Sequence, residues 1–324
     1  MDIVDSPRSR TALRMNSRMP FWQGIQNNFR EFEQIIHPLI GRYVKAIHIS
    51  SQTAIESEPS RLKYVCDICT ATASFSMTLD WQDTRSSAFT CFTEGRYEPK
   101  IEEILIKALQ RQTAGVFVDV GSNEGFHSLN CLATLSSISV VAFEPNPLVR
   151  EKLEKNLLLN ELADRIVVQP YGLGDKHGQL DFFVPRLTGS SGGSLRNLHP
   201  DEGSSDIIQV EIRCLDDFSL RPTALKIDVE GNEMKVLLGG RETIMKHKPI
   251  IVVELLRKWM APFGDHPQDA AKFLLEMGYK MFSIRETSIQ ELSEIDVSTE
   301  ETNFLFVPSE VLKPFFALLD SRSG

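Results

Sequence analysis

The sequence predicts an α/β fold built on a doubly wound, mostly parallel sheet. From about residue 99 onward, short apolar segments alternate with segments of helical period. Strands that alternate with helices are typical of a parallel sheet. Acidic and glycine residues directly follow several apolar segments, as in "GVFVDVG" (115–121) and "SVVAFEPN" (139–146). Ligands bind at these carboxyl ends of strands in such sheets, so the same segments predict a binding site.

The predicted elements after residue 99 follow from the spacing of apolar residues. Helices are predicted, in order, at "KIEEILIKALQRQ", "NEGFHSLNCLATL", "PLVREKLEKNLLLN", "NEMKVLLGGRETIMKH" and "PQDAAKFLLEMG". Strands are predicted at "GVFVDVG", "SVVAFEPN", "RIVVQPYG", "GQLDFFVPR", "IIQVEIRCL", "ALKIDVEG", "PIIVVELL", "YKMFSI" and "NFLFVP".

Residues 1–93 lack this rhythm and are predicted to form an N-terminal extension of unknown role. Apolar residues spaced three and four apart over 29–43 fit an amphipathic helix. The segment "FSMTLDWQDTRSSAFTCF" (75–92) predicts one or two short strands. The chain therefore divides into the extension, a domain over 94–310 and a C-terminal tail over 311–324.

Composition limits the classes of function. The chain of 324 residues has a formal net charge of -9, which argues against a nucleic-acid partner held by a general basic surface. No apolar run approaches the roughly 18 residues of a membrane span. The N-terminus lacks the basic-then-apolar layout of a secretory signal, so a cytoplasmic location is expected. Nothing in the sequence indicates the oligomeric state.

Five scattered cysteines do not resemble a disulfide framework. Cys66 and Cys69 form a C-x-x-C pair, which is half of a typical zinc site or a redox pair. Because no second pair of ligands follows closely, reduced thiols are the favoured interpretation, and metal binding by this pair stays open.

The turn after the first apolar strand of the domain carries the clearest ligand signal. In "VDVGSNEG", Asp119 precedes Gly121-x-x-x-Gly125, which is not the dinucleotide spacing G-x-G-x-x-G. The glycines allow a ligand to approach the backbone closely, and the following helix offers free N–H groups to a carboxylate. Asp119 and Glu124 favour an ammonium group over a phosphate. The turn, with Ser122 and Asn123, therefore suits an amino-acid zwitterion.

Glu144 ends the next strand, 25 positions after Asp119. An acidic residue at about this spacing typically accepts the ribose hydroxyls of a nucleoside. Pro145 and Asn146 follow it and begin the next helix. A ligand that joins a nucleoside to an amino acid satisfies both halves of this site, and S-adenosylmethionine is such a molecule.

The chain from about residue 94 to 308 resembles the FkbM family of S-adenosylmethionine-dependent O-methyltransferases. The matching stretches are "EGRYEP", "FVDVGSNEGFHSL", "VVAFEPNP", "YGLGDKHG", "LKIDVEGNEMKVLLGG", "PIIVVEL" and "NFLFVP". The resemblance implies a Rossmann-like class I methyltransferase fold with seven strands, the last antiparallel. It implies methylation of a hydroxyl on a sugar, a polyketide or another small molecule. It also adds Gly172 and Leu173 to the predicted cofactor contacts, while Ser122 and Glu124 depart from the family's usual residues.

The stretch "ALKIDVEGNEMKVL" (224–237) gathers charges at the end of an apolar strand. Asp228 is predicted beside the reactive methyl group, and Asp228 and Glu230 are the candidate catalytic residues, with Asp228 also a cofactor contact. Lys226 lies on the same strand face and is expected to pair with an acid, because a buried lysine is costly alone. Glu233 falls in the first helical turn and is predicted to be structural.

Alternatives remain open for the chemistry. Asp228 or Glu230 could act as a base, or could join Glu254 in holding Mg²⁺, and the metal ligands are therefore unknown. His127 ranks last as a base. The loop "LTGSSGGSLRNLHP" (187–200) fits either a lid over the acceptor or a solvated linker. Rival functions are a nicotinamide-dependent oxidoreductase and a non-catalytic module that retains the cofactor pocket.

Overall fold

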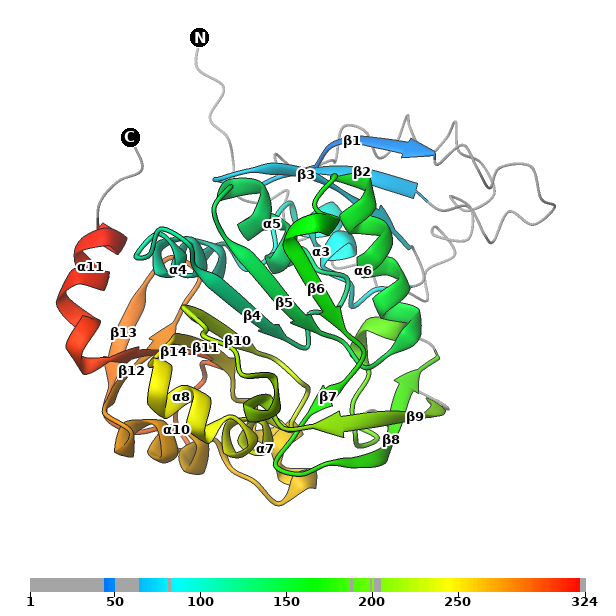
Figure 1. The fold of residues 1–324 in the computed structure, drawn as a ribbon. Coiled ribbons are helices and arrows are strands. Elements are labelled where there is room, and N and C mark those ends of the chain that lie inside the picture. The colour runs from blue at the N-terminus through cyan, green and yellow to red at the C-terminus, as the bar shows by residue number, and fades with distance from the viewer. Residues whose placement is uncertain are drawn as a thin grey trace, which may run out of the picture.

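The structure, a computed structural model, describes residues 44–49, 64–80, 83–186, 189–198, 200 and 205–320. Its centre is an eight-stranded sheet in the order β13-β12-β14-β11-β10-β4-β5-β6 (Figure 1). These strands span, in chain order, β4 (Val116–Val120), β5 (Ser139–Phe143), β6 (Ile166–Gln169), β10 (Ala224–Ile227), β11 (Ile250–Glu254), β12 (Tyr279–Ile284), β13 (Ile289–Leu292) and β14 (Asn303–Pro308).

Most of this sheet is parallel. β4 pairs in parallel with both β5 and β10, and β10 pairs in parallel with β11. β14 runs antiparallel between β11 and β12, which confirms the predicted orientation of "NFLFVP". β13 is an eighth strand, added at the edge as a hairpin partner of β12, where seven strands were expected.

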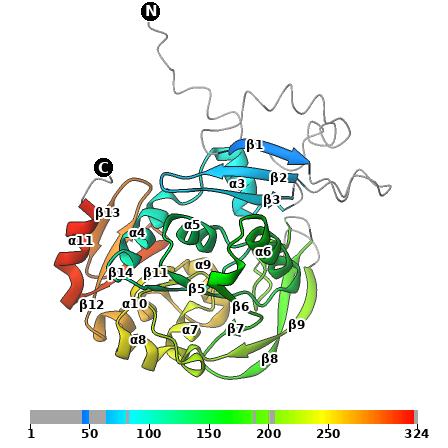
Figure 2. The ribbon, with the colours of Figure 1, turned by 45° about the horizontal axis from the view of Figure 1, so that its top comes forward.

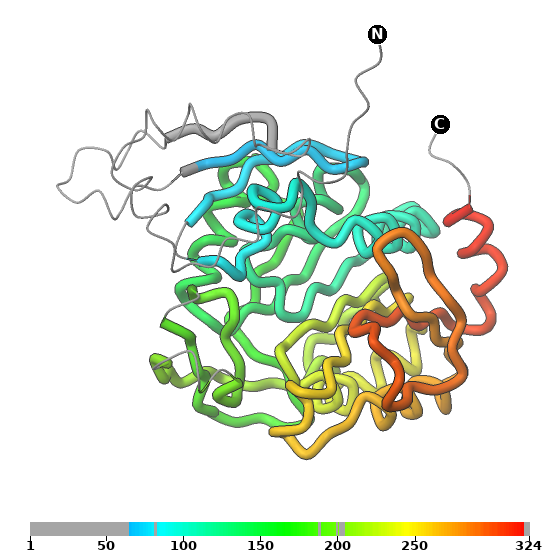
Figure 3. Tube along the Cα trace, turned by 180° about the vertical axis from the view of Figure 1, so that it is seen from behind, coloured from blue at the N-terminus to red at the C-terminus, as the bar shows by residue number. Residues whose placement is uncertain are grey.

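Helices cover both faces of the sheet, as expected for a doubly wound fold (Figures 1 and 3). The α-helices that follow residue 98 are α4 (Pro99–Leu109), α5 (Phe126–Thr134), α6 (Pro147–Leu159), α7 (Glu233–Gly239), α8 (Arg241–His247), α9 (Arg257–Met260), α10 (Pro267–Glu276) and α11 (Leu312–Asp320). One core joins α4, α5, α6 and α11 to the sheet, and a second joins α7, α8 and α10 to its other face. Along β10, Ala224 belongs to the first core and Leu225 to the second, so this central strand is buried on both faces.

Two predictions of regular elements need correction. The expected single helix over 232–247 is split into α7 and α8, because Gly240 between them leaves the helical conformation, with φ of -110° and ψ of 13°. The segments "GQLDFFVPR" and "IIQVEIRCL" are strands but lie outside the central sheet. They form β8 (Gly178–Pro185) and β9 (Ser205–Arg213), which build a separate sheet in the order β7-β9-β8 with β7 (Gly172–Leu173).

The N-terminal segment forms a further layer over the domain. β1 (Val44–Ile49), β2 (Tyr64–Cys69) and β3 (Ser74–Leu79) make an antiparallel sheet that lies beside α5 and α6 (Figure 2). The second half of 75–92 is not a strand, because Ser86 caps a helix there, α3 (Ser87–Glu94). Buried side chains of β2, β3 and α3 belong to the same core as α4 and α5. The helix predicted over 29–43 lies outside the described residues.

The predicted C-terminal tail packs on the domain over much of its length. Phe315 on α11 is fully buried in the core that contains α4.

The two thiols of the C-x-x-C pair lie in different surroundings. Cys66 is buried in the core, whereas the thiol of Cys69 hydrogen-bonds the hydroxyl of Ser74 at 2.7 Å. Positions three apart on a strand point to opposite faces, so β2 does not present these two thiols to one ion. No helix within the described ranges is long and apolar enough to cross a membrane.

Candidate active site

The turn after β4 brings the chain into close contact with the end of β10. Gly121 has a φ of 76°, and a Cβ on it would lie 1.8 Å from the carbonyl oxygen of Asp228. Asn123 and Gly125 are also left-handed, with φ of 52° and 91°. Only glycine tolerates both the conformation and the contact at Gly121. The turn therefore fixes the distance between two strand ends from which the predicted site residues come.

Asp119 is buried at the end of β4, and its carboxylate accepts a 2.6 Å hydrogen bond from the Ser128 hydroxyl on α5. This contact holds one carboxylate oxygen. β4 and β10 pair so that Asp119 lies opposite Lys226. Asp119 thus lies next to the glycine turn and opposite the charged end of β10.

Two backbone N–H groups, from two different turns of the chain, hold the carboxylate of Glu144. Its carboxylate accepts hydrogen bonds from the N–H groups of Asn123 at 3.0 Å and Asn146 at 2.9 Å. Burial raises the pKa of Glu144 to about 7, against the lowering effect of these two donors. Each carboxylate oxygen has a second lone pair, which is free to accept from a ligand hydroxyl.

A cavity of about 310 Å³ joins the predicted residues. Of the positions predicted for the cofactor, it is lined by Asp119, Gly121, Ser122, Asn123, Glu144, Pro145, Asn146, Gly172, Leu173 and Asp228, and Glu230 lines it too. Three left-handed residues other than glycine, Glu98, Asn123 and Glu230, are among its lining. Such backbone conformations cluster at functional sites, because the surrounding structure must hold them.

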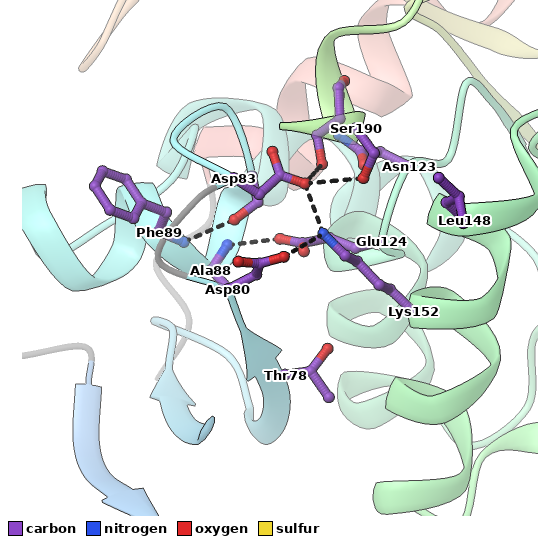
Figure 4. Close-up of polar contacts among 12 residues, drawn as sticks. Thr78, Asp80, Asp83, Ala88, Phe89, Asn123, Glu124, Leu148, Lys152 and Ser190 are labelled. Carbon is purple, nitrogen blue, oxygen red and sulfur yellow. Dashed lines mark hydrogen bonds and ion pairs between the residues drawn. The ribbon is translucent and has the colours of Figure 1, made fainter. Parts of the chain in front are cut away.

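Glu124 is placed differently from the prediction. Its carboxylate accepts 2.7 Å hydrogen bonds from the Ser87 hydroxyl and the Ala88 N–H at the start of α3. Burial raises its pKa to about 7, with a further contribution from Asp83. Glu124 and Gly125 do not line the cavity, and the Glu124 side chain points to α3 (Figure 4). The ammonium contact expected of Glu124 is therefore not available to it in this structure.

Lys226 and Asp228 form an ion pair of 2.8 Å at the end of β10, as expected from their spacing. The Lys226 side chain is 5% exposed and that of Asp228 is 22% exposed. Burial lowers the pKa of Lys226, but the charges of Asp228, Glu98 and Asp119 outweigh it and raise the pKa overall. Lys226 therefore remains charged, and Asp228 presents its more exposed carboxylate to the cavity.

Two further carboxyl groups face the same region. Burial, with the charge of Asp228, raises the pKa of Glu230, and burial with Asp228 and Glu230 raises that of Glu254. One carboxyl oxygen of Glu230 is buried without a hydrogen-bond partner. Glu233, in contrast, accepts from the N–H groups of Val229 and Gly231, which matches its predicted structural role.

The geometry gives no support to Mg²⁺ at these carboxylates. Within the part of the chain that the structure describes, one set of three potential ligands brings its atoms within 4.8 Å of one another, and it consists of His177, Cys214 and Asp217. Asp228, Glu230 and Glu254 do not form such a set. The sequence left open whether a lysine or a metal ion balances the negative charge of these carboxylates. In the structure, Lys226 forms an ion pair with Asp228.

Glu98 was not singled out from the sequence, and the structure places it in the cavity beside His127. Glu98 precedes α4 with a φ of 42°, lines the cavity, and lies 2.8 Å from Nε2 of His127. Burial favours the neutral acid, but the hydrogen bond with His127 and the charge of Lys226 hold the pKa of Glu98 below its usual value. Because Glu98 stands directly before Pro99, the sequence indicates only a helix start; its role depends on contacts distant in sequence.

The glycine-serine segment lies over the cavity and is tied to it. The carbonyl oxygen of Ser190 accepts from the Asn146 amide, and the Ser194 hydroxyl donates to the carbonyl oxygen of Glu230. Asp83 accepts from the hydroxyls of Ser190 and Ser191 and pairs with Lys152 at 2.7 Å (Figure 4). Ser190, Ser191 and Ser194 are therefore held by hydrogen bonds to Asp83, Asn146 and Glu230, unlike a solvated linker.

The strand order, in which β14 runs antiparallel between β11 and β12 at the end of a parallel run of strands, defines a Rossmann-like class I methyltransferase fold. Residues 119–281 match the methyltransferase FkbM domain, a segment that makes up half of the chain. The chain therefore belongs to the FkbM methyltransferase family, whose members are enzymes that use S-adenosylmethionine.

Similar proteins carry related names. The chain is 27% identical over 186 residues to methyltransferase sdnD of Sordaria araneosa, 28% over 163 residues to hexuronic acid methyltransferase AglP of Haloferax volcanii, and 27% over 177 residues to 2-O-methyltransferase NoeI of Sinorhizobium fredii. These matches cover 47%, 50% and 48% of this chain, and 68%, 62% and 70% of the three relatives.

Solved structures that match part of the chain include an FkbM methyltransferase from Methylobacillus flagellatus KT. It is 16% identical with a TM-score of 0.40, and the match covers 70% of this chain and 55% of that one. An S-adenosylmethionine-dependent O-methyltransferase from Thermotoga maritima is 13% identical with a TM-score of 0.37, covering 75% and 77%.

Proposed function

We propose that this protein transfers the methyl group of S-adenosylmethionine to a hydroxyl group of a small molecule such as a sugar or a polyketide. The observation that carries the proposal is that one cavity joins two kinds of site. Its donor half consists of residues 119–123, 144–146 and 172–173. Its acceptor half consists of Glu98, Lys226, Asp228, Glu230 and Glu254.

The donor half suits the nucleoside and amino-acid ends of the methyl donor. Glu144 is fixed by two backbone donors and keeps lone pairs for ribose hydroxyls. Gly121 lets the turn approach the carbonyl oxygen of Asp228 closely, which places the donor half beside the acceptor half. Asp119, buried beside it, offers a carboxylate to an ammonium group.

The acceptor half suits a cationic reaction centre and a hydroxyl. The sulfonium supplies an electrophilic methyl and leaves as a neutral thioether. The chain must align the acceptor oxygen and take its proton. Asp228 is the proposed proton acceptor, because it is the charged carboxylate held at the strand end by Lys226. Glu230, with its unpartnered oxygen, is the proposed acceptor contact. Lys226 positions Asp228 through their ion pair, and the charge of Glu98 favours the charged form of Lys226.

The names of the relatives support a hydroxyl acceptor. AglP is a hexuronic acid methyltransferase and NoeI is a 2-O-methyltransferase. The absence of the dinucleotide spacing at Gly121-x-x-x-Gly125 supports the methyl donor over a nicotinamide.

The test is transfer of label from methyl-labelled S-adenosylmethionine to panels of neutral sugars, uronic acids and polyketide alcohols. We expect an O-methylated product in one panel, and its loss in Asp228→Asn. Tight binding of the donor with no transfer to any hydroxylated panel would instead support a non-catalytic module.

A further inference from the structure

The cluster of His177, Cys214 and Asp217 lies outside the cavity, on the small sheet. His177 stands in the turn between β7 and β8, and Cys214 directly follows β9. β9 is the middle strand, and its Ile212 pairs with Gly172 of β7 on one side and Gly178 of β8 on the other. The pairing therefore brings His177 beside the end of β9, and a short 3-10 helix over Leu215–Phe218 adds Asp217.

The three side chains are already gathered. Nε2 of His177 lies 2.7 Å from Oδ2 of Asp217, and the ligand atoms of all three residues lie within 4.8 Å of one another. The same Asp217 oxygen accepts from the Cys214 N–H at 3.1 Å. This hydrogen bond from the backbone fixes the orientation of the Asp217 carboxylate. Hydrogen bonds of this kind fix the orientation of metal ligands in known sites.

The surroundings favour a cation. Two aspartates, Asp216 and Asp217, follow Cys214 in the short 3-10 helix. Asp216 is occupied by the N–H groups of Glu242 and Thr243 at the start of α8, so its charge stays in place. The side chain of His177 is 66% exposed, which leaves an entry path and an open coordination position.

We propose that His177, Cys214 and Asp217 bind a zinc-class divalent ion. Imidazole nitrogen, thiolate sulfur and carboxylate oxygen are the ligands of Zn²⁺, whereas Mg²⁺ and Ca²⁺ prefer oxygen alone. Three protein ligands leave the fourth tetrahedral position to water. On binding, the thiol proton passes to solvent and the thiolate bonds the ion, with no change of oxidation state.

The ion joins the β7–β8 turn to the end of β9. β7 supplies Gly172 and Leu173 to the lining of the cavity. The ion would therefore stabilise the small sheet that carries this part of the lining. The proposal does not depend on the methyl-transfer function, because it concerns ligands outside the cavity.

The test uses the full chain after treatment with a chelator. Co²⁺ is added to detect the thiolate-to-metal absorption band, and Zn²⁺ binding is measured by calorimetry. Wild type is compared with Cys214→Ser, with His177→Gln, and with the control Cys69→Ser, whose thiol is partly exposed on β2. We expect one ion per chain, the thiolate band, and Zn²⁺ affinity weakened at least about tenfold in the first two variants.

Three results would overturn the site. One is the absence of the band and of Zn²⁺ binding in wild type. Another is equal Zn²⁺ affinity in wild type, Cys214→Ser and His177→Gln. The third is an equal loss in Cys69→Ser, which would mean that the effect is not local to this cluster.

Discussion

The two halves of the cavity differ in how far the chain itself satisfies their charges. In the donor half, the Glu144 carboxylate accepts hydrogen bonds from two backbone N–H groups, and the Asp119 carboxylate accepts one from the Ser128 hydroxyl. In the acceptor half, one Lys226 serves both Asp228 and Glu98, and Glu230 keeps a buried oxygen without a partner. Left-handed backbone occurs in both halves, at Asn123 and at Glu98 and Glu230, so the halves differ in the partners of their carboxylates. The contrast indicates that the donor half is fixed in advance, whereas the acceptor half holds polar capacity for a ligand.

The largest effect is expected at the contact between the halves. Gly121→Ala places a Cβ against the Asp228 carbonyl oxygen, and the left-handed φ alone costs a residue with a Cβ about 1–2 kcal/mol. We expect loss of donor binding and a lower free energy of unfolding. The matched control is Gly178→Ala, where a Cβ meets nothing within 4 Å. Wild-type donor affinity in Gly121→Ala, measured by calorimetry, would refute the close approach.

Next in size is Asp228→Asn, which probes the acceptor half alone. Removing a proton acceptor typically lowers turnover about 100-fold or more. The fold should persist, because Lys226 still has Glu98 and Asp119 nearby. Turnover, donor affinity and thermal unfolding are compared with those of Asp206→Asn, an exposed ion-pair residue of the small sheet. Unchanged turnover would remove Asp228 from the chemistry, while an equal fall in donor affinity would place it in the donor half.

Glu144→Ala probes the donor half. Loss of a hydrogen bond to a charged group costs about 1.5–3 kcal/mol, which is roughly a 10- to 100-fold weaker affinity for S-adenosylmethionine. Calorimetry measures it, with the exposed Glu154→Ala on α6 as the control. If Glu144→Ala binds as tightly as wild type, the ribose contact is wrong.

The smallest effect concerns Glu124, which supports the donor turn from behind. Its pKa is raised from 4.5 to about 7 in the folded protein, so the folded state holds a proton that the unfolded state releases. The resulting stability is complete below about pH 4.5 and is lost as pH rises through about 7. Asp83 and Lys152 are the charged groups that act on it most directly.

Glu124→Gln keeps the acceptor for Ser87 and Ala88 but cannot titrate. Urea unfolding at about pH 5 and pH 8 should show a smaller decline in the free energy of unfolding than in wild type. Glu154→Gln serves as the control. An identical decline in Glu124→Gln and wild type would mean that Glu124 is ionised at both pH values.

The sequence predicts the donor half better than the acceptor half, for a physical reason. Asp119, Gly121 and Glu144 lie at the ends of adjacent apolar strands, and local pattern alone places such positions at one edge of a parallel sheet. The Lys226–Asp228 pair is likewise local. Glu98 is not, because its contact with His127 depends on how α4 packs beside α5.

Glu124 and the N-terminal layer show the same limit. The carboxylate in the glycine turn resembles a ligand contact in sequence, but a helix 36 positions earlier supplies its donors. Asp83, which ties residues 190 and 191 to Lys152, gives no local signal either. The resemblance implied seven strands in the central sheet, whereas the structure has eight. Periodicity predicted β8 and β9 as strands, but it does not say which sheet a strand joins, and both lie in a separate sheet.

The central claim is that the donor half is a preformed site for S-adenosylmethionine. Calorimetric titration of the full chain tests it most directly, with S-adenosylhomocysteine and NADH as competitors. The account predicts one donor molecule per chain, displacement by S-adenosylhomocysteine but not by NADH, and weaker binding in Glu144→Ala. Absence of binding, or displacement by NADH, would contradict it.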